Sequence, residues 1–232
     1  MQKIKTSSNF FFLFLIFINI SNLFANTYKA TKGYSELSKA IQNNYLVKEQ
    51  TQQDCSQSQI IEFFSYSCPA CYKIESKVSE FKNSIKNNDK IKFKKLPVVF
   101  HENWLNAAKL YFTVKKLDLG DKFNDYAFNT IHNNSSYTIT EFDIRKMIDN
   151  FNLQHPKEKI DGRKFSDVFK SNIINRDVKQ SMRLFYALNL KSSPVFVING
   201  KYIVSPQNFN DLNTMFKVIK NLAESQKIVC SD

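Results

Sequence analysis

Two cysteines separated by only two residues, Cys68 and Cys71, constrain this chain more than any other feature. They follow a short apolar run, Ile60–Phe64, that has the length and residue types of a buried strand. Pro69 follows Cys68, and proline is favoured in the first turn of a helix. Apolar residues then recur at the spacing of one face of an amphipathic helix, at Ile74, Val78, Phe81 and Ile85. The pair is therefore predicted at a junction between a strand and a helix.

This junction would give the two thiols different roles. The start of a helix presents free N–H groups and the positive end of the helix dipole to the first sulfur. A thiolate is favoured there, so we expect the pKa of Cys68 to lie below that of a free thiol and Cys68 to be the more exposed, attacking thiol. Cys71, one turn further on, would be the resolving thiol, and exchange would pass through a mixed disulfide with the substrate.

Two other uses of a cysteine pair at this spacing are a zinc site and a purely structural local disulfide. Zinc usually requires a second such pair or histidines at ligand spacing. Cys55 and Cys230 are isolated, and the three histidines show no ligand pattern near them, so no metal is predicted. The junction of strand and helix argues against both uses. A redox-active pair without a further cofactor is the favoured interpretation.

The remaining pattern predicts an α/β domain that is split by helices. A second strand is expected in Lys90–Leu96, and from about residue 102 to residue 190 the pattern is helical without a convincing strand. Strand character returns at Pro194–Ile198, and Asn199-Gly200 is a strong hairpin signal before the return strand Tyr202–Val204. A final helix would carry one apolar face, formed by Phe209, Leu212, Phe216 and Ile219. A helical insertion fits this order because neither outer part has enough strands by itself.

The first 25 residues have the features of a signal peptide. A positively charged start is followed by an apolar stretch, Asn9–Ile18, that is too short to span a bilayer comfortably. Cleavage is expected near Ala25, although Leu23 departs from the usual pattern of small residues, and an uncleaved anchor is the alternative. We therefore expect an exported protein in a compartment where disulfides persist.

The formal net charge of +12 raises the question of a nucleic-acid partner. The lysines are scattered, however, and no run of five or more occurs. A solvated basic surface on an exported protein is therefore favoured, and no nucleic acid is predicted as a partner.

Two segments carry a family resemblance: Phe63–Tyr72, which holds the cysteine pair, and Ser193–Tyr202, which begins with Ser-Pro and continues as an apolar strand. Together they resemble the DsbA family of bacterial periplasmic thiol:disulfide oxidoreductases, over roughly residues 58–225. The resemblance implies a thioredoxin-like domain with an inserted helical domain. The expected divisions are a signal peptide (1–25), an N-terminal arm (26–58), a first thioredoxin-like part (59–100), the helical insertion (101–190) and a second thioredoxin-like part (191–232).

The resemblance also implies site residues outside the pair. The Ser193–Pro194 bond would be cis and lie against the disulfide, where its backbone pairs with substrate peptide. Glu62 would lie beneath the disulfide and assist proton movement from the inner cysteine; a carboxylate in an apolar strand is costly unless it has a partner or a task. Lys95 matches the lysine that accompanies this acid, although the adjacent Lys94 leaves the register open. An edge-exposed Glu62 is the alternative.

The implied function is oxidation of unfolded exported proteins by a monomeric periplasmic enzyme, with reoxidation by a DsbB-like membrane partner. Two departures keep a disulfide isomerase or reductase open. Ala70 stands where the best-known relatives have histidine, which predicts a weaker oxidant, and Ser193 differs from the residues common in the oxidases and in the isomerases. A thioredoxin-like chaperone or binding module with a structural cysteine pair is the non-enzymatic alternative.

If Cys68 pairs with Cys71, the only disulfide left for the other two cysteines is Cys55–Cys230. A bridge between them would close nearly the whole domain, and the chain-entropy model gives roughly 5 kcal/mol for so long a loop. It would also hold in place a C-terminus that would otherwise fray. A structural disulfide is the favoured interpretation, with free thiols or a second exchange pair as alternatives.

Overall fold

The computed structural model describes residues 28–29, 33–39, 41–42, 57–133 and 138–225. Its strands are β1 (Tyr28–Lys29), β2 (Tyr34–Glu36), β3 (Ser58–Phe64), β4 (Ile91–Pro97), β5 (Val195–Ile198) and β6 (Tyr202–Val204). They form a six-stranded sheet in the order β1-β2-β6-β5-β3-β4. Only the pairing of β3 with β4 is parallel among these strands.

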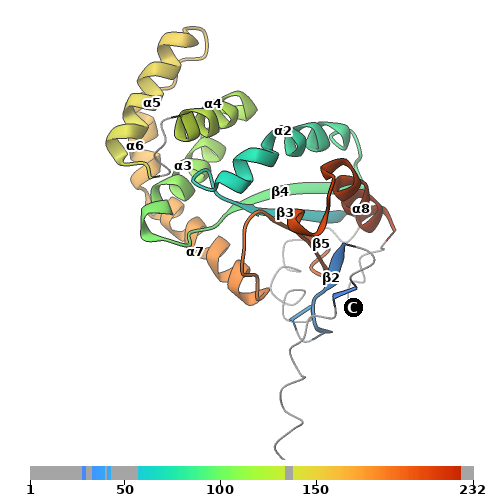
Figure 1. Ribbon diagram of the computed structural model, residues 1–232. Helices are drawn as coiled ribbons and strands as arrows, with labels where there is room; N and C mark the ends of the chain where they lie inside the picture. The colour runs from blue at the N-terminus through green and yellow to red at the C-terminus, as the bar shows by residue number, and fades with distance from the viewer. Residues whose placement is uncertain (1–27, 30–32, 40, 43–56, 134–137, 226–232) are drawn as a thin grey trace, which may run out of the picture.

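Helices cover both faces of this sheet (Figure 1). They are α2 (Pro69–Ser84), α3 (Leu105–Lys116), α4 (Gly120–Asn133), α5 (Glu141–Gln154), α6 (Gly162–Lys170), α7 (Asn172–Ala187) and α8 (Leu212–Glu224), with short 3-10 helices η1 (Glu102–Trp104) and η2 (Pro206–Asn208). Every residue of β3 is buried. Successive side chains of a strand point to opposite faces, so Ile60 packs with α2 and α8, whereas Ile61 packs with α3 and α7. The apolar run therefore forms a central strand that is covered on both sides.

The helices α3 to α7 lie between β4 and β5 in the chain, so the predicted α/β domain interrupted by helices is confirmed. Figure 1 shows α4, α5 and α6 at one side of the molecule, away from β2. Side chains of α3 to α6 share a core cluster with Phe64, Tyr66 and the two cysteines. The insertion thus packs directly against the region of the cysteine pair. The residue numbers at which the domain is divided stay predictions.

The predicted hairpin is present, with β5 and β6 antiparallel. Its two turn residues, Asn199 (φ 53°) and Gly200 (φ 60°), both have positive φ, as the tightest hairpin turns require. The Asn199 side chain also accepts a hydrogen bond from the backbone N–H of Gln59 at 2.7 Å. This contact fixes the turn against the start of β3.

The structure adds two short strands to the predicted arm and corrects one expectation about the last helix. The predicted arm contains β1 and β2, and β2 extends the sheet by pairing with β6. These strands have two and three residues, too few for an alternating pattern to be recognised. The last helix begins at Leu212, after Asp211 caps its N-terminus with hydrogen bonds to Asn213 N and Thr214 N. Phe209 therefore precedes the helix and is not part of its face.

Several predictions fall outside the described residues: the signal peptide, its cleavage near Ala25, and the pairing of Cys55 with Cys230. They stay predictions. Within the described ranges, no helix has the length and apolar character needed to cross a membrane.

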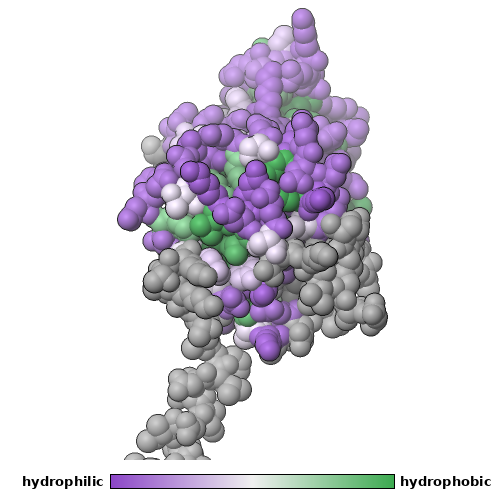
Figure 2. Space-filling view, turned by 90° about the vertical axis from the view of Figure 1, so that its right-hand side faces the viewer, coloured by the Kyte–Doolittle hydropathy of each residue, from purple (hydrophilic) through white to green (hydrophobic). Residues whose placement is uncertain are grey.

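Hydrophilic residues cover most of the face shown in Figure 2, and hydrophobic ones gather in a smaller area near its centre. Five large apolar side chains of the described residues are exposed, and all lie on helices of the insertion: Leu105, Phe142, Leu153, Ile173 and Tyr186.

Candidate active site

The cysteine pair lies where β3 passes into α2, as the sequence predicts. A short turn joins the two elements, in which the Ser67 N–H donates to Ser65 Oγ and the Cys68 N–H donates to Ser65 O, both at 3.1 Å. Cys68 is the N-cap of α2, and its Sγ accepts a hydrogen bond from the N–H of Cys71 at 3.3 Å. Pro69, as the first residue of the helix, has no N–H that would need a partner there. Both cysteines are free thiols in this structure.

The two thiols have opposite acidities. Hydrogen bonds from the Cys71 thiol, the Ser193 hydroxyl and the backbone N–H groups of Cys71 and Ala70 lower the pKa of Cys68 to about 6, although burial opposes them. Burial, followed by interaction with Cys68, raises the pKa of Cys71 well above its ordinary value. The direction of this shift agrees with the predicted thiolate at Cys68, and the role of Cys68 as the nucleophile stays a prediction. Its predicted exposure is small, because only 4% of Cys68 is accessible, compared with 0% of Cys71.

Ser193 lies against the Cys68 sulfur and is followed by Pro194. The peptide bond between them is cis, as expected. The Ser193 hydroxyl is 3.6 Å from Cys68 Sγ, and the Ser193 carbonyl oxygen is also 3.6 Å from it. One can donate a hydrogen bond to a thiolate and the other can accept one from a thiol. The site can therefore hold either protonation state of Cys68.

Glu62 and Lys95 face each other across the parallel pair β3 and β4. Residues paired in register point to the same face, which brings Lys95 Nζ to 3.3 Å from Glu62 Oε2. Glu62 is fully buried, and neither of its carboxylate oxygens accepts a hydrogen bond from the described residues. Burial raises the pKa of Glu62 to about 7, although Lys95 opposes the shift. The structure therefore rules out an edge-exposed Glu62.

Lys95 has a second and closer partner, Glu75, that the sequence analysis missed. Lys95 Nζ donates to the two carboxylate oxygens of Glu75 at 2.7 and 2.6 Å. Burial alone would lower the pKa of Lys95, but Glu62 and Glu75 raise it, so the ammonium is retained. The spacing of four residues between Cys71 and Glu75 could have revealed this group, because it places both on the same face of α2. Lys94, the alternative in the sequence, forms no ion pair with the described residues.

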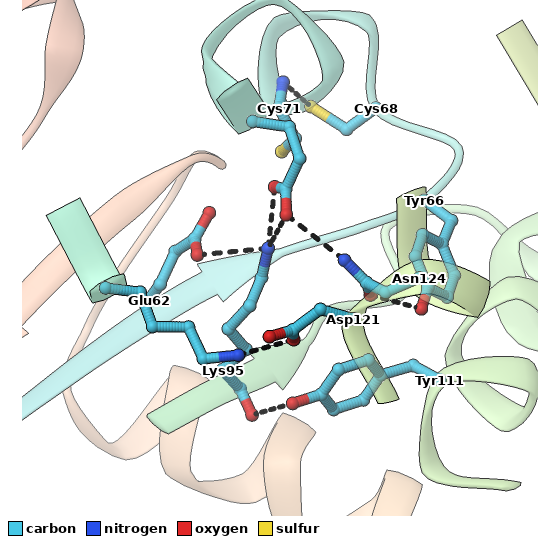
Figure 3. Close-up of polar contacts among 10 residues, drawn as sticks. Glu62, Tyr66, Cys68, Cys71, Lys95, Tyr111, Asp121 and Asn124 are labelled. Atoms are coloured by element: carbon cyan, nitrogen blue, oxygen red, sulfur yellow. Dashed lines mark hydrogen bonds and ion pairs between the residues drawn. The ribbon is translucent and has the colours of Figure 1, made fainter. Parts of the chain in front are cut away.

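The charged triad of Glu62, Lys95 and Glu75 continues into a line of hydrogen bonds (Figure 3). Asn124 Nδ2 donates to Glu75 Oε1 at 3.2 Å, and the Tyr66 hydroxyl donates to Asn124 Oδ1 at 2.5 Å. The Nζ of Lys95 also lies 4.3 Å above the ring of Phe64. The charges beneath the cysteines are therefore held by β3, β4, α2 and α4 together.

A cleft of about 470 Å³ borders this network along β4. Glu75, Lys95 and Asn124 form part of its wall, and exposed lysines such as Lys92 line its outer part. The buried charges are therefore adjacent to solvent on the side of the molecule at β4. Among the described residues, no group of three or more histidine, cysteine, aspartate and glutamate side chains could hold a metal ion.

Comparisons with known proteins give the family and the fold. Residues 52–218 match the family model described as Thioredoxin. The thiol:disulfide interchange protein DsbA of Burkholderia cepacia is 30% identical over 166 residues, which are 72% of this chain and 74% of the relative. The crystal structure of Pseudomonas aeruginosa DsbA superposes with a TM-score of 0.69 at 22% identity, covering 87% of this chain and 95% of that one. The Neisseria meningitidis oxidoreductase NmDsbA1 gives a TM-score of 0.62. The fold is thus a thioredoxin-like domain with an inserted helical domain.

Proposed function

The chain belongs to the DsbA family of thiol:disulfide oxidoreductases, and from this premise we propose that it forms disulfides in exported proteins by donating a Cys68–Cys71 disulfide. The main support for the proposal is the position of the Cys68 sulfur, which lies between two hydrogen-bond donors, the N–H of Cys71 and the hydroxyl of Ser193. A thiolate that is stabilised in the reduced enzyme is a good leaving group, and its stabilisation favours reduction of the enzyme over reduction of the substrate. These properties are those of a net oxidant.

The reaction begins with the oxidised pair. A substrate thiolate attacks Cys68 Sγ, a mixed disulfide forms, and the Cys68–Cys71 bond breaks with its electron pair on Cys71 Sγ. Because the pKa of Cys71 is raised, this sulfur takes up a proton. A second substrate thiolate then attacks the substrate sulfur of the mixed disulfide and releases Cys68 as a thiolate. The substrate loses two electrons, and the enzyme gains them as a dithiol.

Glu62 is proposed to exchange the proton of Cys71. Its pKa of about 7 allows it both to give and to take a proton near neutral pH, which is the requirement for a general acid and base. Lys95 keeps a positive charge beside it in both states, and Glu75 holds Lys95 in place through two hydrogen bonds. The adjoining cleft gives this network a boundary with solvent, where protons can be replaced.

The substrate contact is proposed at Ser193, which lies against the nucleophile, and at Pro194, which is joined to it by a cis peptide bond. The working compartment is proposed to be the periplasm, because residues 1–25 have the pattern of a signal peptide. A membrane protein similar to DsbB would then reoxidise the dithiol by accepting its two electrons. We propose a monomer as the active form.

The test uses the chain without residues 1–25, oxidised, with a reduced unfolded protein that contains two cysteines. Native protein should form the substrate disulfide in stoichiometric amount. Cys68→Ser should abolish exchange, and Cys71→Ser, which cannot form the Cys68–Cys71 disulfide, should leave the substrate reduced. A double variant, Cys55→Ser with Cys230→Ser, is the matched control and should keep the activity. Exchange that survives Cys68→Ser would contradict the proposal.

A further inference from the structure

One face of α4 carries three residues at intervals of four, Asn124, Phe128 and His132. Residues at this spacing lie above one another on a helix. We call them the α4 stripe. All three contact a single residue, Tyr66, which lies in the turn that leads to the nucleophile. The stripe belongs to the inserted helices, whereas Tyr66 belongs to the thioredoxin-like domain.

The stripe holds Tyr66 at both ends. The Tyr66 hydroxyl donates to Asn124 Oδ1 at 2.5 Å, and the Tyr66 carbonyl oxygen accepts a hydrogen bond from His132 Nε2 at 2.8 Å. Between these contacts the Tyr66 ring packs edge-to-face on Phe128, with ring centroids 4.7 Å apart. Tyr66 is fully buried, so it has little freedom to move unless α4 moves with it.

Tyr66 is only two residues before Cys68, and the turn between them is tight. Ser65 accepts hydrogen bonds from the backbone N–H groups of both Ser67 and Cys68. A displacement of the Tyr66 carbonyl therefore moves the same short segment that places the Cys68 sulfur. The thiolate form of that sulfur is stabilised by two hydrogen bonds, one from Cys71 N at 3.3 Å and one from the Ser193 hydroxyl at 3.6 Å. Such contacts weaken steeply as the geometry departs from the ideal.

His132 also reaches the other side of the cysteine pair. Its ring is stacked on that of Tyr72, the residue after Cys71, with centroids 4.3 Å apart and planes at 4°. Tyr72 in turn donates its hydroxyl to Asn129 Oδ1 at 3.0 Å, again on α4. His132 thus contacts residues on both sides of the Cys68–Cys71 segment. Stacking on Tyr72 needs a flat ring, and the hydrogen bond to the Tyr66 carbonyl needs an N–H donor. Histidine supplies both in one side chain.

We propose that His132 is a positioning residue through which the helical insertion holds the Cys68 sulfur against its hydrogen-bond donors. The proposal rests on the proposed function, since it concerns the same nucleophile, and it adds a part for the insertion in tuning it. Loss of the donor to Tyr66 should let the turn relax, weaken the hydrogen bonds to the sulfur and raise the pKa of Cys68. A smaller thiolate fraction makes the thiol less reactive at low pH.

The test compares His132→Phe, which keeps a stacked ring without the donor, with His132→Gln, which keeps a donor without the ring. His155→Phe is the matched control, because the His155 ring packs on Phe151 at the end of α5. The rate of alkylation of reduced Cys68 by iodoacetamide is measured from pH 4 to pH 9, with the modified residue identified by mass spectrometry. Native-like circular dichroism and urea unfolding are required of each variant.

For His132→Phe we expect the alkylation midpoint to rise by about half a pH unit, which makes the reaction about twofold slower at pH 6. The midpoint should rise less in His132→Gln than in His132→Phe, and it should not change in His155→Phe. A native midpoint in a folded His132→Phe variant would overturn the proposal, as would equal shifts in His132→Phe and His155→Phe. If His132→Phe does not fold, His132→Leu, which also lacks the donor, takes its place in the comparison with His155→Phe. Alkylation needs no substrate exchange, so failure of the oxidase assay with native protein is a separate result.

Discussion

The Ser193 hydroxyl lies 3.6 Å from the Cys68 sulfur, although 125 positions separate the two residues in the chain. The sheet explains this proximity. Strands β3 and β5 are antiparallel neighbours in which Phe63 pairs with Val195. The segment that enters β5 therefore lies beside the segment that leaves β3. The whole helical insertion can be placed between them in sequence without disturbing this contact.

Ser193→Ala should raise the pKa of Cys68, because it removes a hydrogen-bond donor to the thiolate. A hydrogen bond of this kind contributes on the order of 1 kcal/mol, so we expect a rise of about half a unit to one unit. The measurement is the pH profile of Cys68 alkylation. Ser192→Ala, one position earlier, is the control and should leave the midpoint unchanged. An unchanged midpoint in Ser193→Ala would show that the hydroxyl does not act on the sulfur.

The stability of the reduced protein should depend on pH through Cys68. Its pKa is lowered from 9.0 to about 6 in the folded state, so its contribution is present above pH 9 and is lost as the pH falls through 6. At pH 7 this contribution is about 1 kcal/mol. Urea unfolding of reduced native protein and of Cys68→Ser at pH 5, 7 and 9 measures it. The difference in the free energy of unfolding should grow with pH, and a constant difference would contradict the assignment.

Glu62 should act on stability in the opposite sense. Burial raises its pKa from 4.5 to about 7, so its contribution is present below pH 4.5 and is lost as the pH rises through 7. Glu62→Gln removes this ionisable group and should stabilise the protein by about 3 kcal/mol at pH 8, with little change at pH 4. Urea unfolding at the two pH values is the measurement, and the control is Glu80→Gln, whose carboxylate is exposed. Destabilisation at pH 8 would mean that the ionised carboxylate is better solvated than the structure shows.

Lys95→Met should be strongly destabilising. It leaves two buried carboxylates, Glu62 and Glu75, without their shared cation, and removal of one partner from a buried ion pair costs about 3–5 kcal/mol. The cost should shrink at pH 5, where protonation of the carboxylates relieves the unpaired charge. Lys94→Met is the matched control, and we expect a change within about 0.5 kcal/mol because Lys94 forms no such pair. Equal effects of the two variants would refute the role of Lys95.

The strand, the helix and the nucleophile at its start could be predicted from the sequence because each rests on a local pattern. The apolar run, the proline after Cys68 and the helical spacing after it are contiguous. Lys95 could be named but not distinguished from Lys94 by the sequence alone. The choice depends on the register between β3 and β4, which pairs Glu62 with Lys95 and points both to the same face.

The contacts that α4 contributes could not be predicted. Asn124 and His132 meet Tyr66 only because the insertion folds back on the turn after β3, and nothing near them in the sequence indicates that packing. The small exposure of Cys68 has the same origin, since residues of the insertion belong to the cluster that contains it. Local sequence patterns predict individual helices and strands. How deeply a site residue is buried depends instead on which distant helices and strands pack over it.

The central claim, that the pair is a net oxidant, is tested most directly by the reduction potential of Cys68 and Cys71 in the chain without residues 1–25. It is measured by equilibration with reduced and oxidised glutathione, with Cys55 and Cys230 mapped by mass spectrometry. The stabilised Cys68 thiolate predicts a potential above that of glutathione, because each unit by which the pKa of Cys68 lies below the working pH favours the dithiol by about 1.4 kcal/mol, or about 30 mV. A potential near −270 mV, as in thioredoxin, would contradict the account and would make the protein a reductase.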